Sequence, residues 1–153
     1  QKLTATPELL FFLLNHPHFQ AKGLAVLTSL LEDPTSEKAH AAISVLSDLA
    51  SDTQGASFLL NPQVMTMDPF AVVAMAYAAI GRVLAANISS DDRSVRAGWD
   101  AVHVLYMLIP QTRGFTAVQN LPVDEFRVVM TALVGATQRR WPSKETGIVE
   151  ITS

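Results

Sequence analysis

The sequence predicts an all-α fold in which helices of repeating length stack side by side. Prolines and capping residues divide the 153 residues into helix-sized segments, and one short segment is followed each time by longer ones. A stretch in the first half, TQGASFLLN (Thr53 to Asn61), returns as TRGFTAVQN (Thr112 to Asn120), 59 residues later. Arrays of helical repeats show this pattern, because a single repeat cannot bury its apolar face alone.

Four helices are predicted in the first half of the chain. Pro7 to Asn15 is short, with Thr6 as N-cap and Pro7 at the first helical position. Pro17 to Glu32 has leucines at helical spacing and ends at Asp33-Pro34. Thr35 to Ala50 is amphipathic, and Thr53 to Leu60 is short again.

The second half repeats the order of short and long helices. Pro69 to Ala86 is apolar nearly all round, so we expect neighbours on several sides. Asp92 to Ile109 is long, Thr112 to Asn120 is short, and Val123 to Trp141 is long. The tail GIVEITS carries the one strand signal. We therefore predict a helical repeat domain over residues 1–141 and an extended tail over residues 142–153.

The period is about 59 residues, which gives about two and a half repeats. Shifting the sequence by this period aligns apolar and small residues of both copies, among them Ala42 with Ala101, Leu46 with Leu105, Leu49 with Leu108 and Gly55 with Gly114. A further partial copy pairs DPFAVV at Asp68 with DEFRVV at Asp124. The recurring stretch is then the short helix that links one repeat to the next.

A short helix followed by two long ones, in tandem, resembles the armadillo family and its HEAT-like relatives. The resemblance is one of architecture, from Pro7 to Trp141. It implies an α-solenoid whose third helices, here Thr35 to Ala50 and Asp92 to Ile109, line a concave groove. In that family the groove binds an extended peptide or a partner helix. We expect a protein partner and a protein-interaction function.

The stretch WDAVH at Trp99 is similar to the W-x-x-x-N pattern of armadillo grooves, with His103 in place of Asn. Residues four apart share a helix face, so the ring can flank a peptide while the polar group bonds its backbone. The predicted binding residues are Glu37, His40, Ser44, Ser47, Asp48, Arg96, Trp99, Asp100, His103 and Tyr106. As an alternative, Trp99 packs in the core with Tyr106, and Glu37 and Asp100 satisfy the two histidines locally.

Composition narrows the classes of partner. Hydrophobic residues make up 49% and charged residues 16%, and the net charge is -3. This balance provides no general attraction to nucleic acid or to a membrane surface. The basic segment Arg139 to Lys144 is interpreted as a helix C-terminus, where cations stabilise the helix dipole. The most apolar run, Phe70 to Gly81, is shorter than a membrane span. We expect a cytoplasmic or nuclear protein.

Catalysis has little support in the sequence. Cysteine is absent, and so are the common nucleotide-binding, hydrolase and zinc-protease motifs. The pairs Glu37-x-x-His40 and Asp100-x-x-His103 have the spacing of carboxylate-bridged metal bundles, but Pro69 to Ala86 lacks the further carboxylate that such a site needs. A metal-dependent bundle enzyme is therefore the weakest alternative. We expect no enzyme activity, no cofactor and no metal.

Assembly is the stronger alternative. The first predicted helix contains LLFFLL and is apolar on most sides, whereas terminal repeats usually carry a polar outer face. Leu9, Phe11 and Phe12 are the predicted assembly face, for a homo-oligomer or for stacking in a longer solenoid. The chain begins with Gln1 rather than Met, so we expect an excised or processed segment, outside which an array of this kind has room to continue.

Overall fold

Local capping interactions begin the helices of the first half. The computed structural model describes Phe12 and residues 15–61, 69–87, 92–138, 140–143 and 147–150. Helix α2 (Pro17–Leu30) has His16 as N-cap, whose Nδ1 accepts from the His18 amide at 3.2 Å. Helix α3 (Glu37–Ser51) has Ser36 as N-cap, so it begins two residues later than predicted. The carboxylate of Asp52 caps the short helix α4 (Thr53–Leu60).

The second half has the predicted order of lengths. Helix α5 (Pro69–Asn87) and α6 (Asp92–Leu108) are long, α7 (Thr112–Gln119) is short, and α8 (Val123–Gln138) is long. The predicted all-α class is confirmed for the part of the chain that runs from α2 to α8. The first predicted helix, Pro7 to Asn15, lies outside the described residues except for Phe12 and Asn15.

The chain after α8 differs from the prediction. Strand β1 (Arg140–Ser143) pairs antiparallel with β2 (Gly147–Glu150), with Trp141 opposite Val149. The prediction that α8 continues to Trp141, and that this basic segment is a helix C-terminus, is therefore wrong. The strand signal at Gly147 is confirmed, and its partner belongs to the same chain. Trp141 and its partner Val149 are eight residues apart in the sequence. Helix periodicity relates residues three or four apart, so it does not reveal this pairing.

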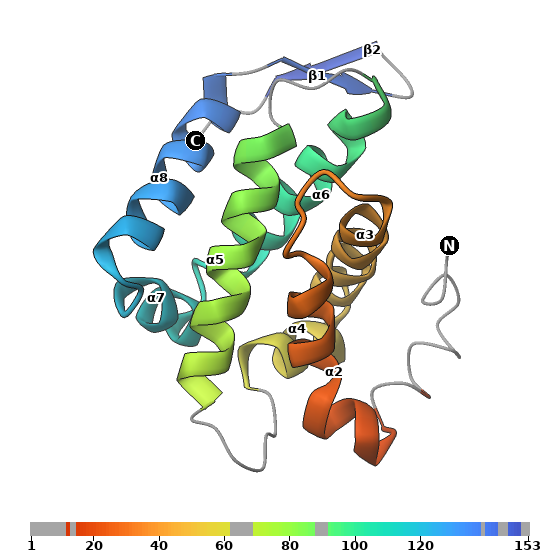
Figure 1. Cartoon of the computed structure of the whole chain (residues 1–153), viewed down its shortest axis with the longest axis vertical. Helices are drawn as coiled ribbons and strands as arrows, with labels where there is room; N and C mark the ends of the chain where they lie inside the picture. The colour runs from red at the N-terminus through yellow and green to blue at the C-terminus, as the bar shows by residue number, and fades with distance from the viewer. Residues whose placement is uncertain are drawn as a thin grey trace.

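The long helices form two rows (Figure 1). Helices α2, α5 and α8 run in the same direction, and α5 contacts both of its neighbours in this row. Helices α3 and α6 lie side by side in the second row. Because α5 also packs against α6 and α7, it has neighbours on several sides, as its apolar circumference predicts. Within the described residues, no helix is sufficiently long and apolar for a membrane span.

Two polar contacts connect helices that are distant in sequence. Asn87 is fully buried and donates through Nδ2 to the carbonyls of Pro34, at 3.0 Å, and Val83, at 2.8 Å. It thereby ties the end of α5 to the turn before α3. Arg82 Nη1 donates to both carboxylate oxygens of Glu125, at 2.7 and 2.9 Å, and connects α5 to α8.

The two copies of the repeated stretch make equivalent corners. In each corner, a carbonyl at the end of the long helix accepts a hydrogen bond from the amide of the N-cap residue of the next short helix. This carbonyl belongs to Leu49 in the first corner and to Leu108 in the second. A Cβ on Gly55 would overlap the Leu49 oxygen, and a Cβ on Gly114 would overlap the Leu108 oxygen. Only glycine lets the short helix approach the preceding helix this closely. The recurrence of TQG and TRG therefore has a packing cause.

Candidate functional site

Helices α3 and α6 carry all ten predicted binding residues. They lie side by side, so residues 52 or more apart in sequence meet across their boundary. Ser51 Oγ, in the last turn of α3, lies 2.8 Å from Nε2 of His103 in α6, within hydrogen-bond distance. Sequence analysis predicted His103 for this surface and did not predict Ser51. The alternative that Asp100 alone satisfies His103 leaves out this contact between the helices.

Asp100 is a buried carboxylate beneath the surface. It is 4% exposed and accepts from Nε of Arg96 at 3.3 Å, while the Arg96 side chain remains 60% exposed. Burial raises the pKa of Asp100; the nearby Arg96 and His103 charges oppose this rise, and the Asp48 charge adds to it. Asp100 therefore lies in one electrostatic cluster with these three groups, and Arg96 is the member of its ion pair that reaches the surface.

The two aromatic residues of the predicted surface are half-buried. Trp99 and Tyr106 pack against the hydrophobic core and keep part of their surface accessible. Burial raises the pKa of the Tyr106 phenol. The core packing fixes each ring, so an exposed edge can contact a ligand without losing much side-chain entropy. The packing against the core that the alternative predicted for Trp99 is thus present, and its role in binding stays a prediction.

The α3 side of the surface is polar and partly covered. Glu37 is exposed, whereas Ser44, Ser47 and Asp48 are half-buried. Nε2 of His40 is buried, and no hydrogen-bond partner for it occurs in the described part of the chain. The predicted local pairing with Glu37 is therefore not made at this nitrogen. A buried donor or acceptor in this condition costs stability unless a ligand or water reaches it.

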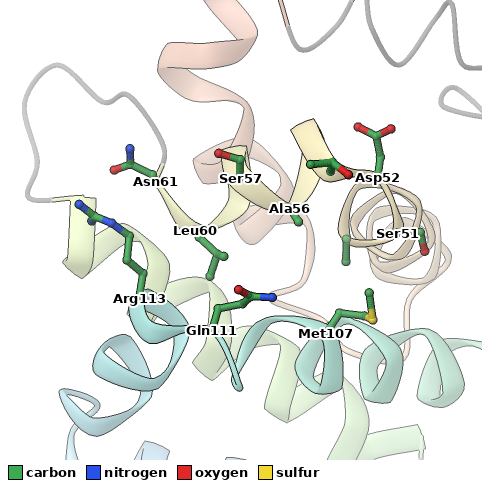
Figure 2. A pocket seen from close by; sticks show the side chains of 11 residues that line it. Ser51, Asp52, Ala56, Ser57, Leu60, Asn61, Met107, Gln111 and Arg113 are labelled. Atoms are coloured by element: carbon green, nitrogen blue, oxygen red, sulfur yellow. The ribbon is translucent and has the colours of Figure 1, made fainter.

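An open cleft of about 600 Å³ adjoins this surface at the short helices. It lies between the α3–α4 corner and the α6–α7 corner, so the repeated stretch forms both of its sides (Figure 2). Ala56 and Leu60 of α4 face Met107 and Gln111 across it. Its remaining lining residues are mostly polar: Ala50, Ser51, Asp52, Thr53, Ser57, Asn61 and Arg113.

The cleft is continuous with the α3–α6 surface through two residues. Ser51 lines the cleft and also contacts His103. Met107, four residues after His103 on α6, lines it as well and is 43% exposed. Sequence analysis did not predict the cleft, because it assigned Thr53 to Asn61 only a linking role. The recurrence of this stretch was the available signal.

Metal-binding geometry is absent from the part of the chain that the structure describes. No group of three or more His, Asp or Glu side chains there could hold a metal ion. The pair Glu37 and His40 and the pair Asp100 and His103 thus gain no third ligand among these residues.

Comparison of the chain with protein-family models, with curated proteins and with solved structures gives no match.

Of the predicted assembly face, only Phe12 belongs to the described residues. Its side chain is 61% exposed. Together with α2 residues that include His18, Phe19, Val26 and Leu27, it lines an apolar hollow of about 390 Å³. Leu9 and Phe11 lie outside the described residues.

Proposed function

We propose that the chain is a protein-interaction module, rather than an enzyme, which binds an extended peptide or a partner helix along α3 and α6. The observation that carries this proposal is the continuous surface from Arg96 and Trp99, through the contact of His103 with Ser51, into the cleft. A surface with fixed aromatic edges, polar groups for a peptide backbone and a partly apolar hollow suits a polypeptide ligand.

An armadillo-like solenoid of about two and a half repeats accounts for the position of this surface. The row of α2, α5 and α8 behind the row of α3 and α6 supports this arrangement, as do the equivalent glycine corners. In such an arrangement the third helices, α3 and α6, line the concave side. Stacked repeats create extended surfaces of this kind because each repeat adds an equivalent helix.

The charged side chains at the two ends of the surface favour one orientation of the proposed ligand. Arg96 is exposed at one end of the surface, and the cleft at the other end is lined by Asp52 and Arg113. Ser57, Asn61 and Gln111 add hydrogen-bonding groups on both sides of the cleft. We therefore expect a ligand with an acidic side chain beside Arg96 and mixed polar and apolar side chains in the cleft.

Peptide selection tests this function. Peptides selected from a random displayed library on the wild-type protein are measured by calorimetry against Trp99→Ala and against Met75→Ala as control. Met75 is 51% exposed on α5, outside the proposed surface. Loss of an aromatic anchor should weaken binding about tenfold or more, with Met75→Ala unchanged. Equal affinity for the wild type and a folded Trp99→Ala variant would show that the surface is wrongly assigned.

A further inference from the structure

Exposed apolar side chains gather at both ends of the row formed by α2, α5 and α8. At the α8 end, the described residues of this kind are Phe115, Val123, Phe126, Met130 and Val134. At the α2 end they are Phe12, Val26 and Leu30. Of the other described residues in this class, Met75 is on α5 between the ends, and Met107 is on α6, outside this row. Large exposed apolar side chains that gather in one region commonly mark an interaction site.

On α8, the exposed residues form a stripe at helical spacing. Val129 and Leu133 face the core and are buried, whereas Met130 and Val134 each follow by one residue, about 100° further round the helix, and are exposed. Helix α8 is thus apolar on two faces and covered on one. Helix α2 has the same property, since Leu27 is buried and Val26 is 51% exposed.

Helix α5 is a helix of the same row whose apolar faces are covered by neighbouring helices. It contacts α2 on one side and α8 on another, and all three run in the same direction (Figure 1). The contact with α8 is close, since a Cβ on Gly81 would lie 2.6 Å from Val129 Cγ2. A helix of this row is therefore covered by the next helix of the row. Among the helices that the structure describes, none makes such a contact with α8 on the side away from α5, and none does so with α2 on the side away from α5.

We propose that a second copy of the chain supplies the missing neighbour, with its α2 face docked on the α8 face of the first. The two faces belong to opposite ends of one row, so their contact continues the α2, α5, α8 sequence from copy to copy. Such a head-to-tail contact is heterologous and does not close after two copies. The chain then forms open-ended oligomers whose length depends on concentration.

Apolar contact carries this association, and charge contributes less. Lys22 is exposed on α2, and Asp124 and Arg127 are exposed on α8. Because the helices run in parallel, Lys22 and Asp124 both lie in the N-terminal half of their helix, so docking of α2 on α8 would bring opposite charges to the same end of the contact. Arg127 offsets part of this attraction, and ion pairs between exposed side chains contribute little to association. We therefore expect weak dependence of the association on salt.

Two single-end variants test the proposal. Val134→Glu blocks the α8 face and Val26→Glu blocks the α2 face; both side chains are more than half exposed, so the fold should tolerate each change. By sedimentation velocity, the wild-type average mass should rise with concentration beyond that of a dimer. Each variant alone should remain at the monomer mass of 16.6 kDa. An equimolar mixture should form a dimer, since each variant retains one complementary face.

The control is Met75→Glu, which adds the same charge at a similarly exposed position between the ends and should associate like the wild type. Circular dichroism verifies that every variant is folded. A wild-type protein that stays monomeric at all concentrations would overturn the proposal. So would a mixture of the two variants that stays monomeric, or a Val26→Glu protein that still dimerises, because that result would indicate a symmetric contact between two α8 faces.

Discussion

Replacing Gly114 with Ala tests the close approach of a short helix to the end of the preceding long helix. The added Cβ would overlap the carbonyl oxygen of Leu108 and lie 2.7 Å from the buried Tyr77 Oη. That carbonyl accepts the Gln111 amide at 3.1 Å, so it cannot move freely. Because the overlap is with a backbone oxygen, the cost of overpacking lies in the upper part of the usual range, about 2–3 kcal/mol, and the better helix propensity of Ala returns about 1 kcal/mol.

The expected result is a net loss of about 1–2 kcal/mol, or about 2–8 °C in Tm for a domain of this size. Gly55→Ala should lose a similar amount, because its Cβ would overlap the Leu49 oxygen. Gly23→Ala is the matched control, since its Cβ meets the ring of Phe19, a side chain that can rotate. Thermal and urea unfolding measure all three. If Gly114→Ala and Gly55→Ala are as stable as Gly23→Ala, the packing explanation of the repeat is wrong.

Three further predictions concern polar residues. Burial raises the folded-state pKa of Asp100 above the ordinary 3.8, so the wild type should lose stability relative to Asp100→Asn as pH rises from about 3.8 through that raised pKa. Urea unfolding of both proteins across this pH range measures the difference, and an equal pH dependence of their unfolding free energies would contradict the prediction. Asn87→Ala should cost about 1–3 kcal/mol in chemical unfolding, because buried carbonyls lose their donor; an unchanged stability would refute this role. Arg82→Ala should cost about 1 kcal/mol or less, since its pair with Glu125 is substantially exposed; a loss of several kcal/mol would show that the pair holds α5 to α8.

Most helix positions could be predicted because their signals are local. Pro17 at a first helical position and Asp52 as a cap determine where α2 and α4 begin, with no information from the rest of the chain. The apolar circumference of α5 predicted neighbours on several sides, and the structure confirms them. These signals act within one turn of helix or within one helix surface, so a single sequence contains them.

The hairpin and the functional surfaces depend on contacts between distant segments. Arg140 to Ser143 form a strand because Gly147 to Glu150 pair with them, which outweighs the helical pattern that precedes them. The stripe on α8 is apolar on two faces, and periodicity alone does not distinguish the covered face from the open one. The cleft exists only because two corners 59 residues apart meet beside α3 and α6.

The central claim is that the α3–α6 surface binds a polypeptide, and mapping of the bound peptide on the protein tests it most directly. Isotope-labelled protein is titrated with a selected peptide, and amide chemical-shift changes are measured along the chain. We predict that the largest changes occur in α3, α4 and α6, around Trp99, His103 and Ser51. Changes confined to the outer faces of α2 or α8, with α3 and α6 unaffected, would contradict the claim.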